Sequence, residues 1–169
     1  MKTHEAISIC IIDDDEMFLQ TLKHYLQGKI KTTLNFKLFK SGEEFLKIAN
    51  KQKIDIIILD YVLNGTYPFA MDGVSVLKKL KQTNPDTKII ILSGQCRIDV
   101  ALESIKEGAH DYIIKNDNAF INIQNIIKNI IPQTIQLKQA KKWKKQIIAF
   151  TIAILLGLFI GMIIHFLFL

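Results

Sequence analysis

The last 23 residues, 147–169, form an apolar segment without a charged side chain, and this segment limits where a water-soluble fold can be built. As an α-helix, with a rise of about 1.5 Å per residue, it would extend roughly 34 Å, whereas the hydrocarbon core of a bilayer is about 30 Å thick. The alternative is a buried helix of a soluble domain, but a domain of this size cannot surround a helix that is apolar on every side. The segment therefore predicts a transmembrane helix that follows the soluble part of the chain.

Five lysines lie directly before this segment, within residues 138–145, and Trp143 lies among them. Cytoplasmic flanks of membrane spans are rich in Lys and Arg, and tryptophan is frequent at the level of the lipid headgroups. The lysines could instead form the solvated face of a helix. The two interpretations are compatible, because a basic helix is also attracted to an anionic leaflet. We expect a single-pass membrane protein whose N-terminal domain is cytoplasmic.

The net charge of +6 belongs largely to this basic segment. All 16 acidic residues and 17 of the 22 basic residues precede residue 138, so the first 137 residues carry a net charge of +1. A nearly neutral domain is a poor electrostatic partner for nucleic acid. Residues 132–146 are also too short for a DNA-binding module. We therefore predict that this chain does not bind nucleic acid.

Residues 1–131 alternate short apolar runs with amphipathic segments. The apolar runs, at 7–12, 33–39, 54–59, 89–92 and 112–114, predict strands. The amphipathic segments, at 16–27, from 41 onward, and at 73–81, 98–106 and 119–131, predict helices. Five strands alternating with five helices predict an α/β fold, a doubly wound parallel sheet with helices on both faces. We expect this domain at 1–131, a basic helical linker at 132–146 and the transmembrane helix at 147–169.

Polar residues follow the predicted strands at their carboxyl ends, where functional groups collect in such sheets. They are Asp13, Asp14, Asp15, Asp60, Ser93 and Lys115. Any one of them could simply end a strand, but together they form a chemical set. Clustered carboxylates repel one another unless a hard cation such as Mg²⁺ neutralises them. One carboxylate could then attack phosphorus while the lysine and the serine contact the phosphoryl oxygens, which predicts an aspartyl phosphate.

Residues 7–131 resemble the receiver domain of two-component response regulators. The resemblance rests on IIDDD, IIILD and IIILSG at the ends of the first, third and fourth predicted strands, and on GAHDYIIK around the fifth. Ser93 and Lys115 also have the spacing that is usual in the family, with Tyr112 three positions before the lysine. The resemblance implies a flavodoxin-like fold with strand order 2-1-3-4-5. It also implies a phosphorelay switch that receives its phosphoryl group from a histidine kinase or a phosphotransfer protein.

The resemblance further implies a role for each acidic residue. Asp60 would be the phosphoacceptor. Asp14 and Asp60 would bind Mg²⁺ directly, Asp13 would assist through water, and the main-chain carbonyl of Val62 would be a further ligand. Asp15 is expected to cap the first helix rather than to bind the metal.

Three more residues would act on the phosphoryl group. Lys115 would contact it and Ser93 would form a hydrogen bond with it, while Tyr112 would rotate inward as the switch aromatic. The family commonly has a cis-proline after the lysine, but here Asn116 follows. A cis bond without proline would cost about 3–4 kcal/mol, so we expect a trans bond.

The family usually has an Asp-Gly pair shortly after the phosphoacceptor, but in this sequence the pair stands farther along the chain. Asp72-Gly73 comes after the segment YVLNGTYPFAM, which contains an insertion. The insertion affects the expected Val62 ligand and the access of water to Asp60. Since no reacting group is missing, we expect an active receiver.

Two other functions remain open from the sequence. One is a membrane-tethered adaptor whose receiver fold works without phosphorylation, and the other is a metal-dependent phosphohydrolase. We do not expect an enzyme, because a receiver hydrolyses its own aspartyl phosphate rather than an external substrate. A partner that still binds when Mg²⁺ binds weakly or not at all would identify the adaptor, and multiple turnover of an external phosphomonoester would identify the hydrolase.

Gly157 and Gly161 form a GxxxG step within the apolar segment. Such a step lets two helix backbones approach closely, although glycine is frequent in transmembrane helices in any case. It indicates a possible homodimer formed through the membrane span.

Overall fold

The computed structural model describes residues 6–49, 52–63 and 71–167. The chain divides into two compact units, Met1–Ile131 and Pro132–Leu169. The described part of the first unit contains a sheet and the helices that cover it, and that of the second is helical. The finer division at residues 146 and 147 stays a prediction.

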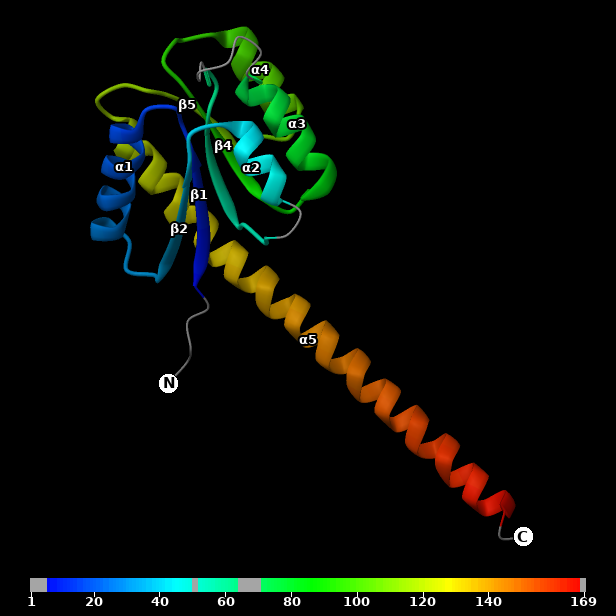
Figure 1. Ribbon diagram of the computed structural model, residues 1–169. Coiled ribbons are helices and arrows are strands. Elements are labelled where there is room, and N and C mark those ends of the chain that lie inside the picture. The colour runs from blue at the N-terminus through cyan, green and yellow to red at the C-terminus, as the bar shows by residue number, and fades with distance from the viewer. Residues whose placement is uncertain (1–5, 50–51, 64–70, 168–169) are drawn as a thin grey trace. The chain divides into compact units, whose positions relative to one another are not determined.

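Five parallel strands in the described residues form one sheet in the order β2-β1-β3-β4-β5 (Figure 1). The strands are β1 (Ile7–Ile12), β2 (Leu34–Phe39), β3 (Ile56–Asp60), β4 (Lys88–Ser93) and β5 (Asp111–Ile114). Every neighbouring pair is parallel. The predicted doubly wound sheet with order 2-1-3-4-5 is therefore confirmed.

Two strands end one residue later than the apolar pattern indicates. The pattern predicted ends at Leu59 and Leu92, but β3 includes Asp60 and β4 includes Ser93. In the parallel register Asp60 pairs with Leu92, and Ser93 pairs with Ile114. Strand pairing is made by backbone groups and does not stop where the side chains become polar. The two polar side chains are consequently fixed by the sheet itself.

Helices cover both faces of this sheet. They are α1 (Glu16–Lys29), α2 (Gly42–Ala49), α3 (Gly73–Thr83), α4 (Ile98–Lys106) and α5 (Ala119–Leu167). In Figure 1, α1 and the first turns of α5 lie on one side of the sheet, and α2, α3 and α4 lie on the other. The hydroxyl of Tyr25 in α1 donates a hydrogen bond of 2.8 Å to Gln124 Oε1 in α5, which ties these two helices together.

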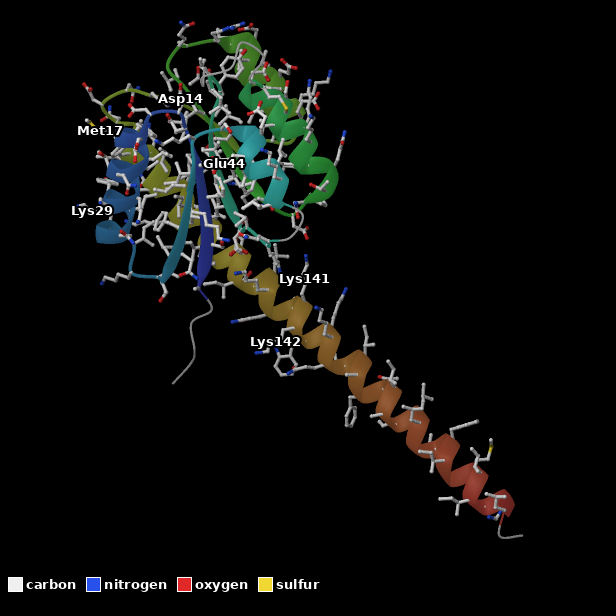
Figure 2. All side chains as sticks on the ribbon, in the orientation of Figure 1. Asp14, Met17, Lys29, Glu44, Lys141 and Lys142 are labelled. Carbon is white, nitrogen blue, oxygen red and sulfur yellow. The ribbon has the colours of Figure 1, made fainter. Side chains whose placement is uncertain are left out.

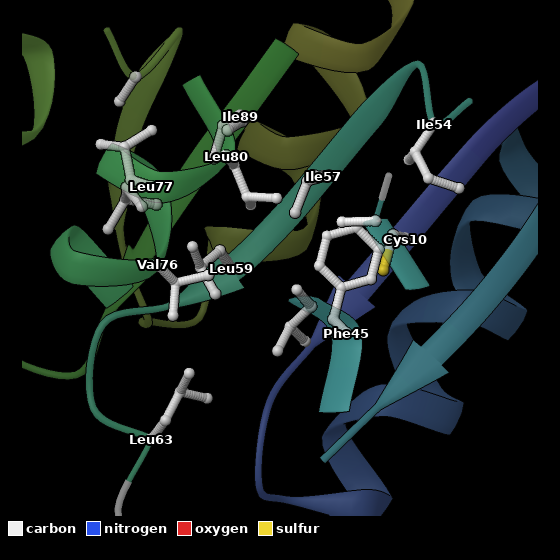
Figure 3. Packing of buried hydrophobic residues seen from close by; sticks show 14 residues of the cluster. Cys10, Phe45, Ile54, Ile57, Leu59, Leu63, Val76, Leu77, Leu80 and Ile89 are labelled. Carbon is white, nitrogen blue, oxygen red and sulfur yellow. The ribbon is translucent and has the colours of Figure 1, made fainter. Parts of the chain in front are cut away.

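The core explains why the strands are so rich in isoleucine. On one face of the sheet, alternate residues of the central strands pack against side chains of α2 and α3, as Figure 3 shows for Cys10 beside Phe45 and for Leu59 beside Val76. The residues between them are also fully buried, because alternate side chains of a strand point to opposite faces. A sheet buried on both faces is a rigid base for the polar residues at its edge.

The second unit consists of the continuation of α5. Pro132 lies inside this helix, although proline has no N–H to donate to the preceding turn. The stretch Ala119–His165 is long enough and apolar enough to cross a membrane, by length and composition. The large apolar side chains of its described residues beyond 146 are exposed in the single chain. The structure thus contains a candidate for the transmembrane helix that the sequence predicts.

Candidate functional site

The predicted polar residues meet at the carboxyl edge of the sheet. Asp13 follows β1, Asp60 ends β3, Ser93 ends β4 and Lys115 follows β5. Asp13, Asp60 and Ser93 are buried, whereas Asp14 is exposed. Figure 2 places Asp14 at the end of the domain where α1 begins. The structure therefore brings the acids, the hydroxyl and the lysine to one edge, as the sequence predicted.

Lys115 joins the two buried carboxylates. Its Nζ lies 2.7 Å from Asp13 Oδ2 and 2.9 Å from Asp60 Oδ2. Burial disfavours the ammonium form, but the hydrogen bonds and charges of both carboxylates outweigh this and raise the pKa of Lys115. Among the residues that the structure describes no peptide bond is cis, so the bond after Lys115 is trans, as predicted.

The charged forms of the Asp13 and Asp60 carboxylates are destabilised by their surroundings. Burial, followed by the charge of Asp13, raises the pKa of Asp60 to about 6, and Lys115 and the N–H of Val62 only partly oppose this. Burial likewise raises the pKa of Asp13. One lysine thus faces two buried carboxylates, which leaves a local excess of negative charge that a cation would relieve.

The donor set fits a hard divalent cation. Asp13, Asp14 and Asp60 each offer an oxygen, and these oxygens lie within 4.8 Å of one another. In addition, Asp60 Oδ1 is buried without a hydrogen-bond partner among the described residues. Carboxylate oxygens with access to water from an exposed side are the ligands that Mg²⁺ prefers. The predicted ligation by Asp13, Asp14 and Asp60 is consistent with this arrangement, and ligation by the Val62 carbonyl stays a prediction.

The candidate switch residues share one main-chain acceptor. Ser93 Oγ donates to the carbonyl oxygen of Gln95 at 3.0 Å, and the Tyr112 hydroxyl donates to the same oxygen at 3.1 Å. The N–H of Gln95 returns a bond of 3.3 Å to Ser93 Oγ. Sequence reasoning missed Gln95, because its backbone rather than its side chain makes these contacts.

Gly73 reaches the phosphoacceptor candidate in spite of the insertion. Its N–H donates to the carbonyl oxygen of Tyr61 at 2.9 Å, and a Cβ atom at position 73 would lie 2.5 Å from the carbonyl oxygen of Asp60. Just before it, the N–H of Met71 donates to Glu43 Oε1 at 2.7 Å. The insertion itself falls largely on residues 64–70, outside the described residues. Position 73 therefore needs a glycine for this close packing.

Phe18 also lies at the site, although no feature of the sequence predicted it there. Its ring centroid lies 4.7 Å from Lys115 Nζ. The helical periodicity identified Phe18 only as an apolar position of the first helix. In a second cation–aromatic contact, the Arg97 guanidinium lies 5.8 Å from the centroid of the Tyr61 ring. Tyr61 directly follows Asp60 in the sequence.

Gly157 and Gly161 lie in α5 with open space around them in the single chain. A Cβ atom added at either position would meet no atom within 4 Å, helix backbone aside. The predicted packing of a second copy at these glycines stays a prediction.

Comparisons with known proteins agree with this geometry. Residues 9–128 match the family model of the response regulator receiver domain. The chain is 30% identical over 132 residues to the transcriptional regulatory protein ZraR of Escherichia coli (strain K12), which covers 78% of this chain and 28% of that protein. The chain thus spans little more than a quarter of that relative's length.

Solved structures give the same result. A response regulator protein from Burkholderia pseudomallei, with a phosphorylated aspartic acid, calcium ion and citrate, is 26% identical with a TM-score of 0.60, covering 80% of this chain and 72% of that one. A CheY-like receiver domain protein from Methanospirillum hungatei JF-1 shares the fold, at 22% identity and a TM-score of 0.65, with coverage of 78% and 98%. By its fold and its match to the family model, the chain belongs to the response regulator receiver domain family.

Proposed function

We propose that this chain is a membrane-anchored receiver in a phosphorelay, and that Asp60 accepts its phosphoryl group from a histidine kinase or a phosphotransfer protein. The state of the Asp60 carboxylate carries this proposal. It is buried, its Oδ2 contacts Lys115, and its Oδ1 has no hydrogen-bond partner among the described residues. Buried polar atoms with a purely structural role are normally paired. An unpaired oxygen is therefore free to react or to bind a cation.

The Asp60 carboxylate would act as the nucleophile. A bond forms between an Asp60 oxygen and phosphorus, and the bond between phosphorus and the donor's imidazole nitrogen breaks. The imidazole keeps the electron pair and takes up a proton as it leaves. Mg²⁺ bound by Asp14 and Asp60, with Asp13 through water and the Val62 carbonyl, would supply positive charge against the phosphoryl oxygens.

Lys115 and Ser93 would bind the transferred group. Lys115 is already in contact with the carboxylate, so its ammonium can exchange a carboxylate oxygen for a phosphoryl oxygen without a large movement. Ser93 Oγ would have to leave the Gln95 carbonyl, which also holds the Tyr112 hydroxyl. Release of both donors would let Tyr112 turn inward and would change the surface around β5 that a partner contacts.

The second unit would anchor this switch to a membrane with the receiver domain in the cytoplasm. The exposed apolar side chains of α5 beyond residue 146 and the five lysines that precede them support this. Lys141 and Lys142 project from α5 in Figure 2. Tethering would raise the effective concentration of the receiver near a membrane-bound kinase without a new contact. The nearly neutral first unit favours a protein partner over nucleic acid.

The decisive experiment treats the full chain in lipid nanodiscs with acetyl phosphate and Mg²⁺ and measures the intact mass. We expect one added phosphoryl group in the wild type, none in Asp60→Asn, and full labelling in Asp117→Asn, which removes an exposed carboxylate outside the site. Chelation of Mg²⁺ should abolish labelling. No label on the wild type, or label on Asp60→Asn, would overturn the proposal.

The same preparation separates the other two functions. A partner that binds wild type and Asp60→Asn equally, with no labelled species, would identify an unphosphorylated adaptor. Multiple turnover of an external phosphomonoester would identify a hydrolase, whereas we propose a cycle limited to the protein's own aspartyl phosphate. The anchor is tested independently, since an anchored protein stays in the membrane fraction after high-salt and carbonate washing.

A further inference from the structure

Lys115 is held on two sides by carboxylates and on a third by an aromatic ring. Its Nζ donates toward Asp13 at 2.7 Å and toward Asp60 at 2.9 Å, and lies 4.7 Å from the centroid of the Phe18 ring. A cation within about 6 Å of an aromatic centroid is attracted by the ring's negative face. The half-buried Phe18 ring therefore acts on the ammonium group that neutralises the phosphoacceptor candidate.

The position of Phe18 depends on the same Asp13 that binds Lys115. Asp13 Oδ1 accepts a hydrogen bond of 3.0 Å from the N–H of Asp15. Asp15 Oδ1 in turn caps α1 by accepting from the N–H groups of Met17 and Phe18 at 2.8 and 3.1 Å, as the sequence predicted. Asp13 Oδ1 thus orients the start of α1, and Asp13 Oδ2 binds Lys115. Lys115 is in turn in contact with the Phe18 ring of α1.

A second ring supports Phe18 from the side of α5. Phe120 meets it edge to face, with centroids 5.5 Å apart and planes at 79°. Phe120 also lies 5.4 Å from Tyr25, whose hydroxyl is bonded to Gln124. Edge-to-face contact fixes the plane of a ring as well as its place. The face of Phe18 is consequently held toward Lys115 by packing between α1 and α5.

We propose that Phe18 is a positioning residue for phosphoryl transfer, which it promotes by holding the Lys115 ammonium over the Asp60 carboxylate. The inference rests on the proposed function of Asp60. A lysine side chain has a flexible four-carbon stem, and a ring face on one side reduces the positions open to its ammonium. When Asp60 gains a phosphoryl group, Lys115 must exchange an Asp60 oxygen for a phosphoryl oxygen, and the Phe18 ring would keep the ammonium within reach of both.

The test uses the full chain in lipid nanodiscs with ¹³C-labelled lysine ε-carbons, first without metal. The ring current of Phe18 should shift the ε-methylene resonance of Lys115 upfield, and Lys115→Arg assigns that resonance by its loss. We expect Phe18→Leu to abolish the shift and Phe18→Tyr, which keeps the ring, to retain it. Labelling by acetyl phosphate with Mg²⁺ should slow roughly three- to tenfold in Phe18→Leu, the range expected for one cation–π contact, and recover in Phe18→Tyr.

Two further variants separate positioning from folding. Phe39→Leu removes a partly buried ring that packs against Phe45 on the other side of the sheet, and should leave both readouts unchanged. Phe120→Leu keeps the Phe18 ring but removes its support, and should reduce both readouts less than Phe18→Leu does.

The outcomes are distinct. Equal labelling in wild type and Phe18→Leu, or an unchanged Lys115 resonance, would overturn the inference while the proposed function stands. Equal slowing in Phe18→Leu and Phe18→Tyr would also overturn it, because the ring would then not be what matters. No labelling of the wild type would overturn the proposed function, and this inference with it.

Discussion

Gly73 packs directly against the backbone of Asp60, at a distance that leaves no room for a side chain. We predict that Gly73→Ala lowers the free energy of unfolding by about 1–3 kcal/mol, the usual cost of overpacking a filled site. It should also slow labelling of Asp60, because the Asp60–Tyr61 backbone must move. Denaturant unfolding of the full chain in detergent measures the first effect. Gly28→Ala is the control, since a Cβ there meets no atom within 4 Å apart from the helix backbone and alanine favours a helix. Equal destabilisation by both would contradict the prediction.

The raised pKa of Asp60 predicts how stability depends on pH without metal. The pKa is about 6 in the folded protein against 3.8 for the ordinary carboxyl group, so the folded state holds this proton more tightly. The resulting stabilisation is complete below pH 3.8 and is lost as the pH rises through about 6. We expect the free energy of unfolding to fall by up to ~3 kcal/mol over this range. Asp60→Asn should flatten the dependence in part, because the pKa of Asp13 is raised as well. A wild-type profile that rises with pH here would contradict this.

Removal of Mg²⁺ should lower the free energy of unfolding more at neutral than at acidic pH. A metal that binds the folded state at about ten times its Kd stabilises it by roughly 1.4 kcal/mol. Because Asp60 must be deprotonated to bind, its pKa of about 6 predicts proton release on binding near that pH and weaker binding below it. Titration calorimetry in buffers of different ionisation enthalpy measures both effects. Asp14→Asn, at an exposed position, should lose binding while the metal-free protein remains as stable as the wild type. A pH-independent affinity would count against carboxylate ligation.

The apolar segment at 147–169 gives a prediction that does not depend on phosphorylation. If Gly157 and Gly161 let two helices pack closely, Gly157→Ile and Gly161→Ile should weaken self-association of residues 143–169 in a transmembrane-association reporter. A Cβ atom at either glycine meets no atom within 4 Å in the single chain, helix backbone aside, so insertion of the helix into the membrane should be unaffected. Equal signals from the wild type and the two variants would contradict the predicted dimer but not the predicted membrane anchor.

Much of the site could be predicted because its residues are attached to regular elements. A parallel sheet brings the carboxyl ends of its strands together, so the positions of Asp60 and Ser93 follow from the strand pattern alone. The contact between Phe18 and Lys115 joins segments far apart in sequence, and it depends on ring orientation that periodicity does not encode. The role of Gly73 depends likewise on a distance to the backbone of another segment. The Gln95 carbonyl has no side-chain signature at all.

That carbonyl has a consequence for how the protein can vary. Every amino acid at position 95 supplies the same main-chain oxygen, so no point substitution there deletes the acceptor shared by Ser93 and Tyr112. A substitution at position 95 would therefore change the side chain beside the site, while the backbone still offers the oxygen that holds both hydroxyl groups. If Ser93 and Tyr112 act as the proposed switch, the contact that restrains them is protected against mutation at the residue that provides it.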